Sequence, residues 1–367
     1  MKFVVAILIF CIIVLFHEWG HFLLAKKNGI KVEEFSIGLG PTIIGFTKGE
    51  TKYSIKLLPF GGACMMQGED EDVQGGNSEH ENGFGANPSK IKIDESRSFC
   101  NKTPLQRISV VAAGPLFNFL MAFIFSVILI GLHGHTQPIV YDVMPGYSAQ
   151  AAGMEAGDEI IKMGKMRVHF YEEITGYTLF HPGEDIQVTY LRDGQTYTTT
   201  LEQKYDEDAG RYLMGIYGAN EYVKEGPIGT LKYGLYEMKY WIWYTLNSLK
   251  MLVTGQVSVN DVSGPVGIVT VVADAYEQSM ADGIYYVFLN MMNIAILLSA
   301  NLGVMNLLPI PALDGGRLVF LIIELIRGKK VDPKREGMVH FIGLMCLLGL
   351  MVLVMANDVR KLFFGMF

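Results

Sequence analysis

Residues 3–25 read FVVAILIFCIIVLFHEWGHFLLA, and this stretch decides the class of fold. Apart from three ionisable side chains near its end it is apolar, and as a helix it is long enough to cross ~30 Å of hydrocarbon. Only one charged residue, Lys2, precedes it, and no small-residue cleavage site follows it. We therefore expect a retained membrane span rather than a cleaved signal peptide.

The three ionisable side chains of this span are His17, Glu18 and His21, in the pattern H-E-x-x-H. Residues four apart share a helix face, so the two imidazoles can bind one zinc ion while the glutamate acts on water. The alternative is a chance match in which the histidines only form hydrogen bonds within a helix bundle. Because each ionisable group in hydrocarbon costs ~2.5 kcal/mol or more, we favour the metal site.

A catalytic zinc usually has three protein ligands, so a third ligand is expected from another part of the chain. The segment 301–318, NLGVMNLLPIPALDGGRL, carries the only suitable carboxylate in another span region, that of Asp314. Pro309 and Pro311 break the helix just before it, and broken backbone at membrane depth is buried in protein or lines a cavity. Asp314 is thus a candidate ligand. An ordinary aspartate at the start of a helix in a cytoplasmic loop explains it equally well.

Three further segments are predicted to span the bilayer, namely 114–132, 286–308 and 339–356. Basic residues cluster after the first span, before the second, and between the third and fourth. This pattern predicts that the N-terminus and residues 133–285 are extracytoplasmic. The segment 231–253 mixes charges with Trp and Tyr, which favours a helix at the membrane interface over a fifth span.

The composition agrees with a mixture of spans and a polar, acidic part. The chain has 367 residues, of which 50% are apolar and 18% charged, with a formal net charge of -7. Since no dense basic stripe offsets this charge, nucleic acid is excluded as an expected partner. The loop 69–87 is acidic, and its His80 is expected to be solvated rather than bound to metal. The four scattered cysteines are interpreted as packing residues.

The polar part of the chain is predicted to fold as one inserted α+β domain over residues 136–205. Within it, Asp193 and Gly194 separate two alternating runs, which is a hairpin signal. Residues 206–285 are predicted to form the interfacial helix and connecting segments. The remaining parts are an N-terminal membrane part, 1–135, and a C-terminal membrane part, 286–367.

The cytoplasmic loop, about 30–107, contains a predicted short strand at 52–58, KYSIKLL, followed by P-F-G-G. An exposed strand edge can hold an extended peptide by adding it to the sheet. This makes Ile55, Leu57, Gly61 and Gly62 candidate substrate-binding residues. The alternative is a hairpin that merely covers the site.

Several motifs now combine. HEWGH at 17–21 is followed by GPLFN at 114–118 and by NLLPIPALD at 306–314, and the loop carries FSIGLGP at 35–41 and LPFGG at 58–62. With these motifs, the chain resembles the site-2 protease family of intramembrane zinc metalloproteases over nearly its whole length. It is most similar to the bacterial RseP/RasP-like branch. The run AAGMEAGDEI and the later Asp-Gly turn resemble a single bacterial PDZ domain.

This resemblance implies a polytopic α-helical membrane protein of about four transmembrane helices, with a short membrane-associated β-hairpin and an inserted extracytoplasmic PDZ-like α+β domain. It implies one Zn2+ per chain and Glu18 as the catalytic general base. Asn306 would bind substrate or catalytic groups, and Asn118 would help to shape the site. The implied zinc ligands are His17, His21 and Asp314.

The function implied is that of a zinc-dependent endopeptidase in the bacterial cell membrane, with its active site inside the bilayer toward the cytoplasmic side. Its expected partners are single-span membrane proteins such as anti-sigma factors, or remnant signal peptides, which the PDZ domain would bind or exclude. The alternative is a non-catalytic membrane receptor or scaffold that uses its PDZ domain around a structural metal. A structural zinc normally has four protein ligands, and the sequence offers three.

Overall fold

The computed structural model describes residues 2–69, 95–218, 221–257 and 263–364. The chain divides into two compact units. The first, here called the helical unit, comprises residues 1–122 and 258–367, and the second, the β-rich unit, comprises residues 123–257. Most of the predicted acidic loop 69–87, including His80, lies outside the described residues.

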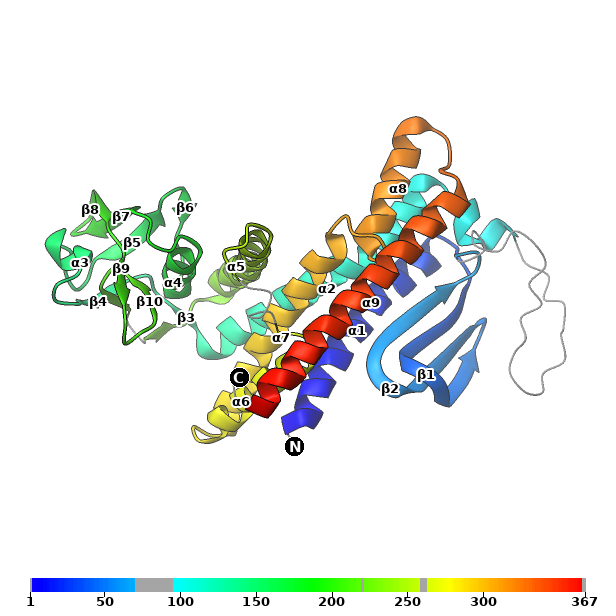
Figure 1. Cartoon of the computed structure of the whole chain (residues 1–367), viewed down its shortest axis with the longest axis horizontal. Helices are drawn as coiled ribbons and strands as arrows, with labels where there is room; N and C mark the ends of the chain where they lie inside the picture. The colour runs from blue at the N-terminus through cyan, green and yellow to red at the C-terminus, as the bar shows by residue number, and fades with distance from the viewer. Residues whose placement is uncertain (1, 70–94, 219–220, 258–262, 365–367) are drawn as a thin grey trace. The chain divides into compact units, whose positions relative to one another are not determined.

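Four helices are long and apolar enough to cross a membrane (Figure 1). They are α1 (Lys2–Lys27), α2 (Pro104–His133), α7 (Ile284–Leu307) and α9 (Pro333–Phe364). Each predicted span falls within one of them, except that residue 308 of the third span lies one residue beyond the end of α7. Two helices begin earlier than predicted, α2 at Pro104 instead of 114 and α9 at Pro333 instead of 339. Both start with polar turns, which a search for apolar runs excludes.

Two shorter helices complete the helical unit. Helix α6 (Pro265–Met280) precedes α7, and helix α8 (Asp314–Arg327) follows it. A buried ion pair between Arg107 of α2 and Glu324 of α8 joins these two helices. The charge of Arg107 near the start of α2 is tolerated because a buried charge can be stabilised by an opposite charge.

Strands β1 (Val32–Lys48) and β2 (Thr51–Met66) form a long hairpin beside α1 (Figure 1). The hairpin folds back on itself, so that residues 34–37 pair both with 52–55 and with 62–65. Residues 52–55 pair in addition with residues 44–47, on the other side of the turn. The predicted strand 52–58 is therefore not an exposed edge, because its first half has neighbours on both sides. In the described chain, residues 62–65 have a strand neighbour on one side only.

The β-rich unit contains a four-stranded antiparallel sheet in the order β6-β5-β7-β8. Asp193 and Gly194 form the turn between β7 and β8, both with positive φ, as the sequence predicts. Two helices, α3 and α4, and further short strands surround the sheet. The bounds of the sheet strands and of these helices are β5 (Glu159–Met163), β6 (Met166–Arg167), β7 (Ile186–Arg192), β8 (Gln195–Leu201), α3 (Ser148–Ala151) and α4 (Tyr171–Phe180).

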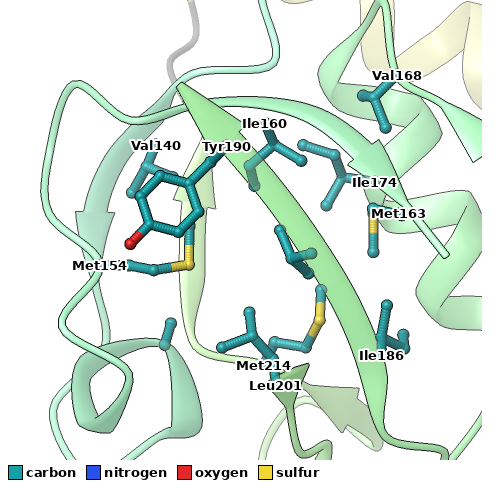
Figure 2. Close-up of a cluster of buried hydrophobic side chains, with 12 residues drawn as sticks. Val140, Met154, Ile160, Met163, Val168, Ile174, Ile186, Tyr190, Leu201 and Met214 are labelled. Carbon is teal, nitrogen blue, oxygen red and sulfur yellow. The ribbon is translucent and has the colours of Figure 1, made fainter. Parts of the chain in front are cut away.

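Buried side chains from these strands and helices form the core of this unit (Figure 2). Ile160 and Met163 of β5, Val188 of β7 and Leu201 of β8 are fully buried. Figure 2 shows Tyr190 and Met154 at one side of this cluster and Val168 at the other. An ion pair between Arg192 and the buried Asp158 joins the end of β7 to the segment before β5.

The β-rich unit extends beyond the predicted boundary at residue 205. Strand β11 (Ile216–Gly218) pairs with β4 (Val140–Val143), and β12 (Tyr222–Val223) pairs with β3 (His135–Thr136). A small hairpin, β9 (Lys204–Asp206) with β10 (Arg211–Leu213), lies between. The chain thus returns to the start of the domain. Strands of two or three residues carry too little alternation for a sequence to reveal this.

Helix α5 (Pro227–Val253) contains the predicted interfacial segment 231–253. It is not among the candidate spans found in the described residues. Its aromatic side chains pack partly on α4, since Trp243 and Tyr244 contact the ring of Phe180 edge-on. These aromatics serve the core of the β-rich unit as well as any lipid contact.

Candidate metal centre

Two glycines allow α1 and α2 to meet at the level of the histidines. A Cβ atom on Gly20 would lie 2.5 Å from the carbonyl oxygen of Ala113, so the two backbones are in direct contact there. A Cβ atom on Gly114 would lie 2.3 Å from Nε2 of His21. Small residues permit this close approach of membrane helices. The space that Gly114 leaves empty is occupied by the imidazoles of His17 and His21.

Three side-chain atoms converge at this point: Nε2 of His17, Nε2 of His21 and Oδ2 of Asp314. The two nitrogens are 3.2 Å apart, and Oδ2 lies 3.2 Å from His17 and 3.4 Å from His21. Ligand atoms bound to a tetrahedral zinc ion at ~2.0–2.1 Å lie about 3.3 Å from one another. The three atoms therefore have the spacing of three corners of a zinc coordination tetrahedron.

The electrostatics of the triangle also fit a cation. Oδ2 of Asp314 is buried and has no hydrogen-bond partner of acceptable geometry among the described residues. A buried carboxylate oxygen without a well-aligned hydrogen bond is costly, because the two nearby imidazole nitrogens replace only part of the water it has lost. A metal ion between the three atoms would satisfy this oxygen and both imidazole lone pairs. In the described chain, these three residues are the one group that could hold a metal ion.

The Nδ1 atoms of both histidines, which face away from the triangle, contact residues of α2. Nδ1 of His21 lies 2.9 Å from the carbonyl oxygen of Val110 and donates to it. Nδ1 of His17 lies 3.1 Å from the side-chain amide of Asn118. Such contacts fix the orientation of both rings, and the Val110 carbonyl leaves Nε2 of His21 free to bind a metal.

Asn118 is completely buried, and its backbone is hydrogen-bonded to helix α7. The hydroxyl of Ser299 on α7 donates to its backbone carbonyl at 2.8 Å, while its Oδ1 has no partner among the described residues. Since amide oxygen and nitrogen are assigned from the hydrogen-bond network, the reversed orientation would let Oδ1 accept from Nδ1–H of His17. Asn118 thus contacts a histidine from the side opposite to the triangle.

Glu18 lies beside the triangle and under β2. The backbone N–H of Cys64 is within hydrogen-bonding reach of its carboxylate. A Cβ atom on Gly62 would lie 3.0 Å from Cγ of Glu18, so the hairpin covers this side chain closely. Burial, and next the Glu18 carboxylate, raise the pKa of the Cys64 thiol, which keeps it neutral and unsuited to bind metal.

Comparison with known proteins gives the family of this chain. The model of peptidase family M50 matches residues 5–350. The chain belongs to this family. Zinc metalloprotease RasP of Geobacillus kaustophilus is 35% identical, over 97% of this chain and 97% of its own length. Zinc metalloprotease RasP of Bacillus licheniformis is 33% identical over 97% of this chain and 98% of its own. The protein named regulator of sigma-W protease RasP in Bacillus subtilis is 32% identical, with the same coverage.

This M50 chain is accordingly a zinc metalloprotease, and its four apolar helices indicate a membrane protein. The predicted residues His17, His21 and Asp314 lie together, although the sequence left Asp314 undecided. Glu18 lies next to them. The hydrogen bond from His21 to the Val110 carbonyl could not be predicted from the sequence. A backbone carbonyl is present whatever residue occupies that position, so no sequence motif marks it.

The other predicted site residues of this M50 chain are distributed differently. Asn306 is half-buried at the end of α7 and makes no side-chain hydrogen bond within the described ranges. Ile55 pairs with both Ile37 and Ile44, so its backbone is not available to a substrate. The side chain of Leu57 is 56% exposed. Of the four hairpin residues, Gly62 is the one that the structure brings against Glu18, with Gly61 next to it.

Proposed function

We propose that this chain is an intramembrane endopeptidase that cuts transmembrane helices, with His17, His21 and Asp314 as zinc ligands and Glu18 as general base. The observation that carries the proposal is the triangle formed by Nε2 of His17, Nε2 of His21 and Oδ2 of Asp314, whose sides are 3.2–3.4 Å long. Both histidines belong to the apolar helix α1. A metal site within a candidate span supports hydrolysis inside the bilayer. Three protein ligands leave a fourth position open, as a catalytic zinc requires.

Zinc, when bound, acts as a Lewis acid that polarises the scissile carbonyl and lowers the pKa of water. Glu18 is the neighbouring base that takes the proton from the attacking water and delivers it to the leaving nitrogen. The Val110 carbonyl keeps His21 in the tautomer that leaves Nε2 unprotonated, and Asn118 does the same for His17 when its amide oxygen faces Nδ1. The close cover of Gly62 and Cys64 limits the directions from which a peptide can reach Glu18.

The edge of β2 at residues 62–65 is the proposed place for the substrate. Its backbone has one strand neighbour among the described residues, so its other side can pair with an extended peptide. Because Gly62 lies against Glu18, a peptide added at this edge would pass the catalytic base. Asn306, one turn before the broken segment that leads to Asp314, is proposed to contact the same peptide.

The proposed substrates are single-span membrane proteins, such as an anti-sigma factor, and remnant signal peptides. The relative named regulator of sigma-W protease supports the first class. The β-rich unit is proposed to be a single PDZ domain that binds or excludes substrates. In the proposed topology, this unit and the N-terminus lie outside the cell, with the metal centre toward the cytoplasmic side.

The test is cleavage of a single-span substrate by the full chain in liposomes. Glu18→Gln should bind zinc to the wild-type level and leave the substrate uncut, whereas Asp314→Ala should lose zinc as well as activity. Cleavage by Glu18→Gln at the wild-type rate would contradict the assigned base. If both variants bind zinc normally and the wild-type chain cuts nothing, the non-catalytic receptor becomes the better explanation.

A further inference from the structure

Helix α9 is the least covered of the four candidate spans. Only 6% of its most apolar window is buried, compared with 50% in α7. From His340 onward, the positions that are at least half-buried share one face of the helix. They are His340, Gly343, Leu347, Val354, Asn357, Asp358 and Lys361. The position of α9 therefore depends on a few contacts along one narrow stripe.

Two neighbouring residues of this stripe contact the loop that precedes Asp314. The backbone N–H of Ala312 donates to Nδ1 of His340 at 2.9 Å. One turn later, a Cβ atom on Gly343 would lie 2.4 Å from Cβ of Pro311 and 2.8 Å from its carbonyl oxygen. Helix α9 thus touches residues 311 and 312 directly, through a hydrogen bond and through a backbone contact that only glycine permits.

The loop also packs against the start of α8, where Cβ atoms on Gly315 and Gly316 would lie 2.2 Å and 2.4 Å from the carbonyl oxygens of Leu308 and Ile310. Pro309 and Pro311 have no N–H group, and Ala312 adopts φ +76, a conformation that non-glycine residues rarely take. The N–H of Ile310 bonds to Leu308 and that of Leu313 bonds to Ile310. His340 accepts the N–H of Ala312, the residue whose backbone is the most strained. Asp314 follows two residues later as the first residue of α8.

We propose that His340 is a positioning residue for the metal centre: by accepting the Ala312 N–H, it fixes the loop that aims the carboxylate of Asp314 at the two histidines. The inference rests on the proposed role of Asp314 as a zinc ligand. Because Nδ1 is the acceptor, the neutral ring carries its proton on Nε2, which lies 4.0 Å from the carboxylate of Glu336. His340 therefore acts through the loop and is not a ligand.

The other end of α9 offers a matched control. Asp358 is completely buried and accepts the backbone N–H of Gly264 at 3.0 Å and that of Gly267 at 2.8 Å, at the start of α6. These hydrogen bonds attach α9 to α6, as the bond of His340 attaches it to the loop at residues 311 and 312, but they do not involve that loop. A variant at Asp358 loosens the helix without removing the bond to Ala312.

A purely structural role for His340 predicts different results from a positioning role. Its ring also contacts the ring of Phe320, with centroids 5.5 Å apart. His340→Phe keeps an aromatic ring there but has no acceptor. His340→Asn loses the ring, while its Oδ1 can stand where Nδ1 was. The two variants separate ring packing from hydrogen bonding.

The experiment measures zinc affinity of the full chain in nanodiscs by competition with a chromophoric chelator, and the absorption spectrum of the Co2+-loaded protein. His340→Phe should weaken zinc binding about tenfold, the lower range for residues that orient a ligand, and alter the Co2+ spectrum. His340→Asn should restore most of the affinity. Asp358→Asn should leave affinity and spectrum unchanged. Gly343→Ala, whose new methyl group would displace Pro311, should show the same loss of zinc affinity and the same change of spectrum as His340→Phe. It replaces His340→Phe in the experiment if that variant does not fold.

Three results would overturn the inference. They are wild-type affinity and spectrum in His340→Phe, equal defects in His340→Phe and His340→Asn, and a defect in Asp358→Asn as large as in His340→Phe. Asp314→Ala separates the two levels of proposal. If it binds zinc normally, the proposed ligand set is wrong. If it loses zinc while His340→Phe does not, only the role of His340 is wrong.

Discussion

Gly114 on α2 faces Nε2 of His21 so closely that a Cβ atom at this glycine would lie 2.3 Å from the nitrogen. The absence of a side chain on one helix is thus a condition for the metal-binding geometry on the other. Because Cβ would also lie 2.7 Å from Cε1 of His17, neither imidazole can turn aside to make room without displacing the other.

Gly114→Ala is therefore expected to weaken zinc binding at least about tenfold, as loss of ligand geometry does. Zinc content after purification and the affinity in a chelator competition measure this. Gly131→Ala on the same helix is the control, because its Cβ would make only an ordinary contact, 3.5 Å from Thr230. Equal zinc binding by Gly114→Ala and the wild-type chain would show that α1 and α2 separate freely.

Asn118→Leu should weaken zinc binding about 10- to 100-fold, because the ring of His17 loses the group that orients it. The affinity for zinc and the Co2+ spectrum are the measurements. Asn290→Leu serves as the control, since Asn290 lies on a membrane helix too but bonds to Ser279, away from the triangle. A loss of cleavage with unchanged zinc affinity would instead place Asn118 in contact with substrate.

Glu50, in the turn of the hairpin, should stabilise the fold in a pH-dependent way. Hydrogen bonds from Arg97 and from Lys26 lower the pKa of its carboxyl to about 2. A lowered folded-state pKa contributes stability above the ordinary value of 4.5, and this contribution is lost as the pH falls toward 2. Glu50→Gln should thus unfold at a lower temperature than wild type at pH 7, with a difference that shrinks toward pH 3. A constant difference would contradict the ion pair.

Glu237 on α5 should change the stability of the fold with pH in the opposite direction to Glu50. Burial, and next the nearby Glu172, raise the pKa of its carboxyl to about 7, while Trp241 donates to it at 2.8 Å. A raised pKa favours the protonated folded form, so stability decreases as the pH rises through 7. Glu237→Gln keeps the acceptor for Trp241 and removes the charge. Thermal unfolding should show it more stable than wild type at pH 8 and nearly equal at pH 5. Destabilisation at pH 8 would contradict a buried carboxylate.

The candidate spans and the common face of the two histidines could be predicted because their signals are local. An apolar run long enough to cross a bilayer and a spacing of four residues on a helix are both visible in one short segment. Asp314 could not be decided in this way. Its role depends on the close approach of α8 to α1, and the same aspartate at a helix start would look identical in an exposed loop.

The hairpin shows where sequence reasoning fails. The alternation in 52–58 correctly predicts a strand, but an alternating pattern does not reveal how many neighbours a strand has. In the fold, residues 34–37 lie between two stretches of β2, and the edge with a single strand neighbour in the described chain is at residues 62–65. Similarly, Asn118 is recognisable as part of a motif, whereas its contact with the rear of His17 depends on the crossing of α1 and α2.

The three converging donor atoms come from opposite ends of the chain, two from α1 and one from α8. A ribosome completes α1 early, yet Asp314 emerges only after the β-rich unit and α7 have been made. During synthesis the nascent chain thus holds at most two of the three proposed ligands. If these residues hold the zinc ion as proposed, the protease stays inactive until its last helices have been made, so the order of the sequence sets the time at which activity begins.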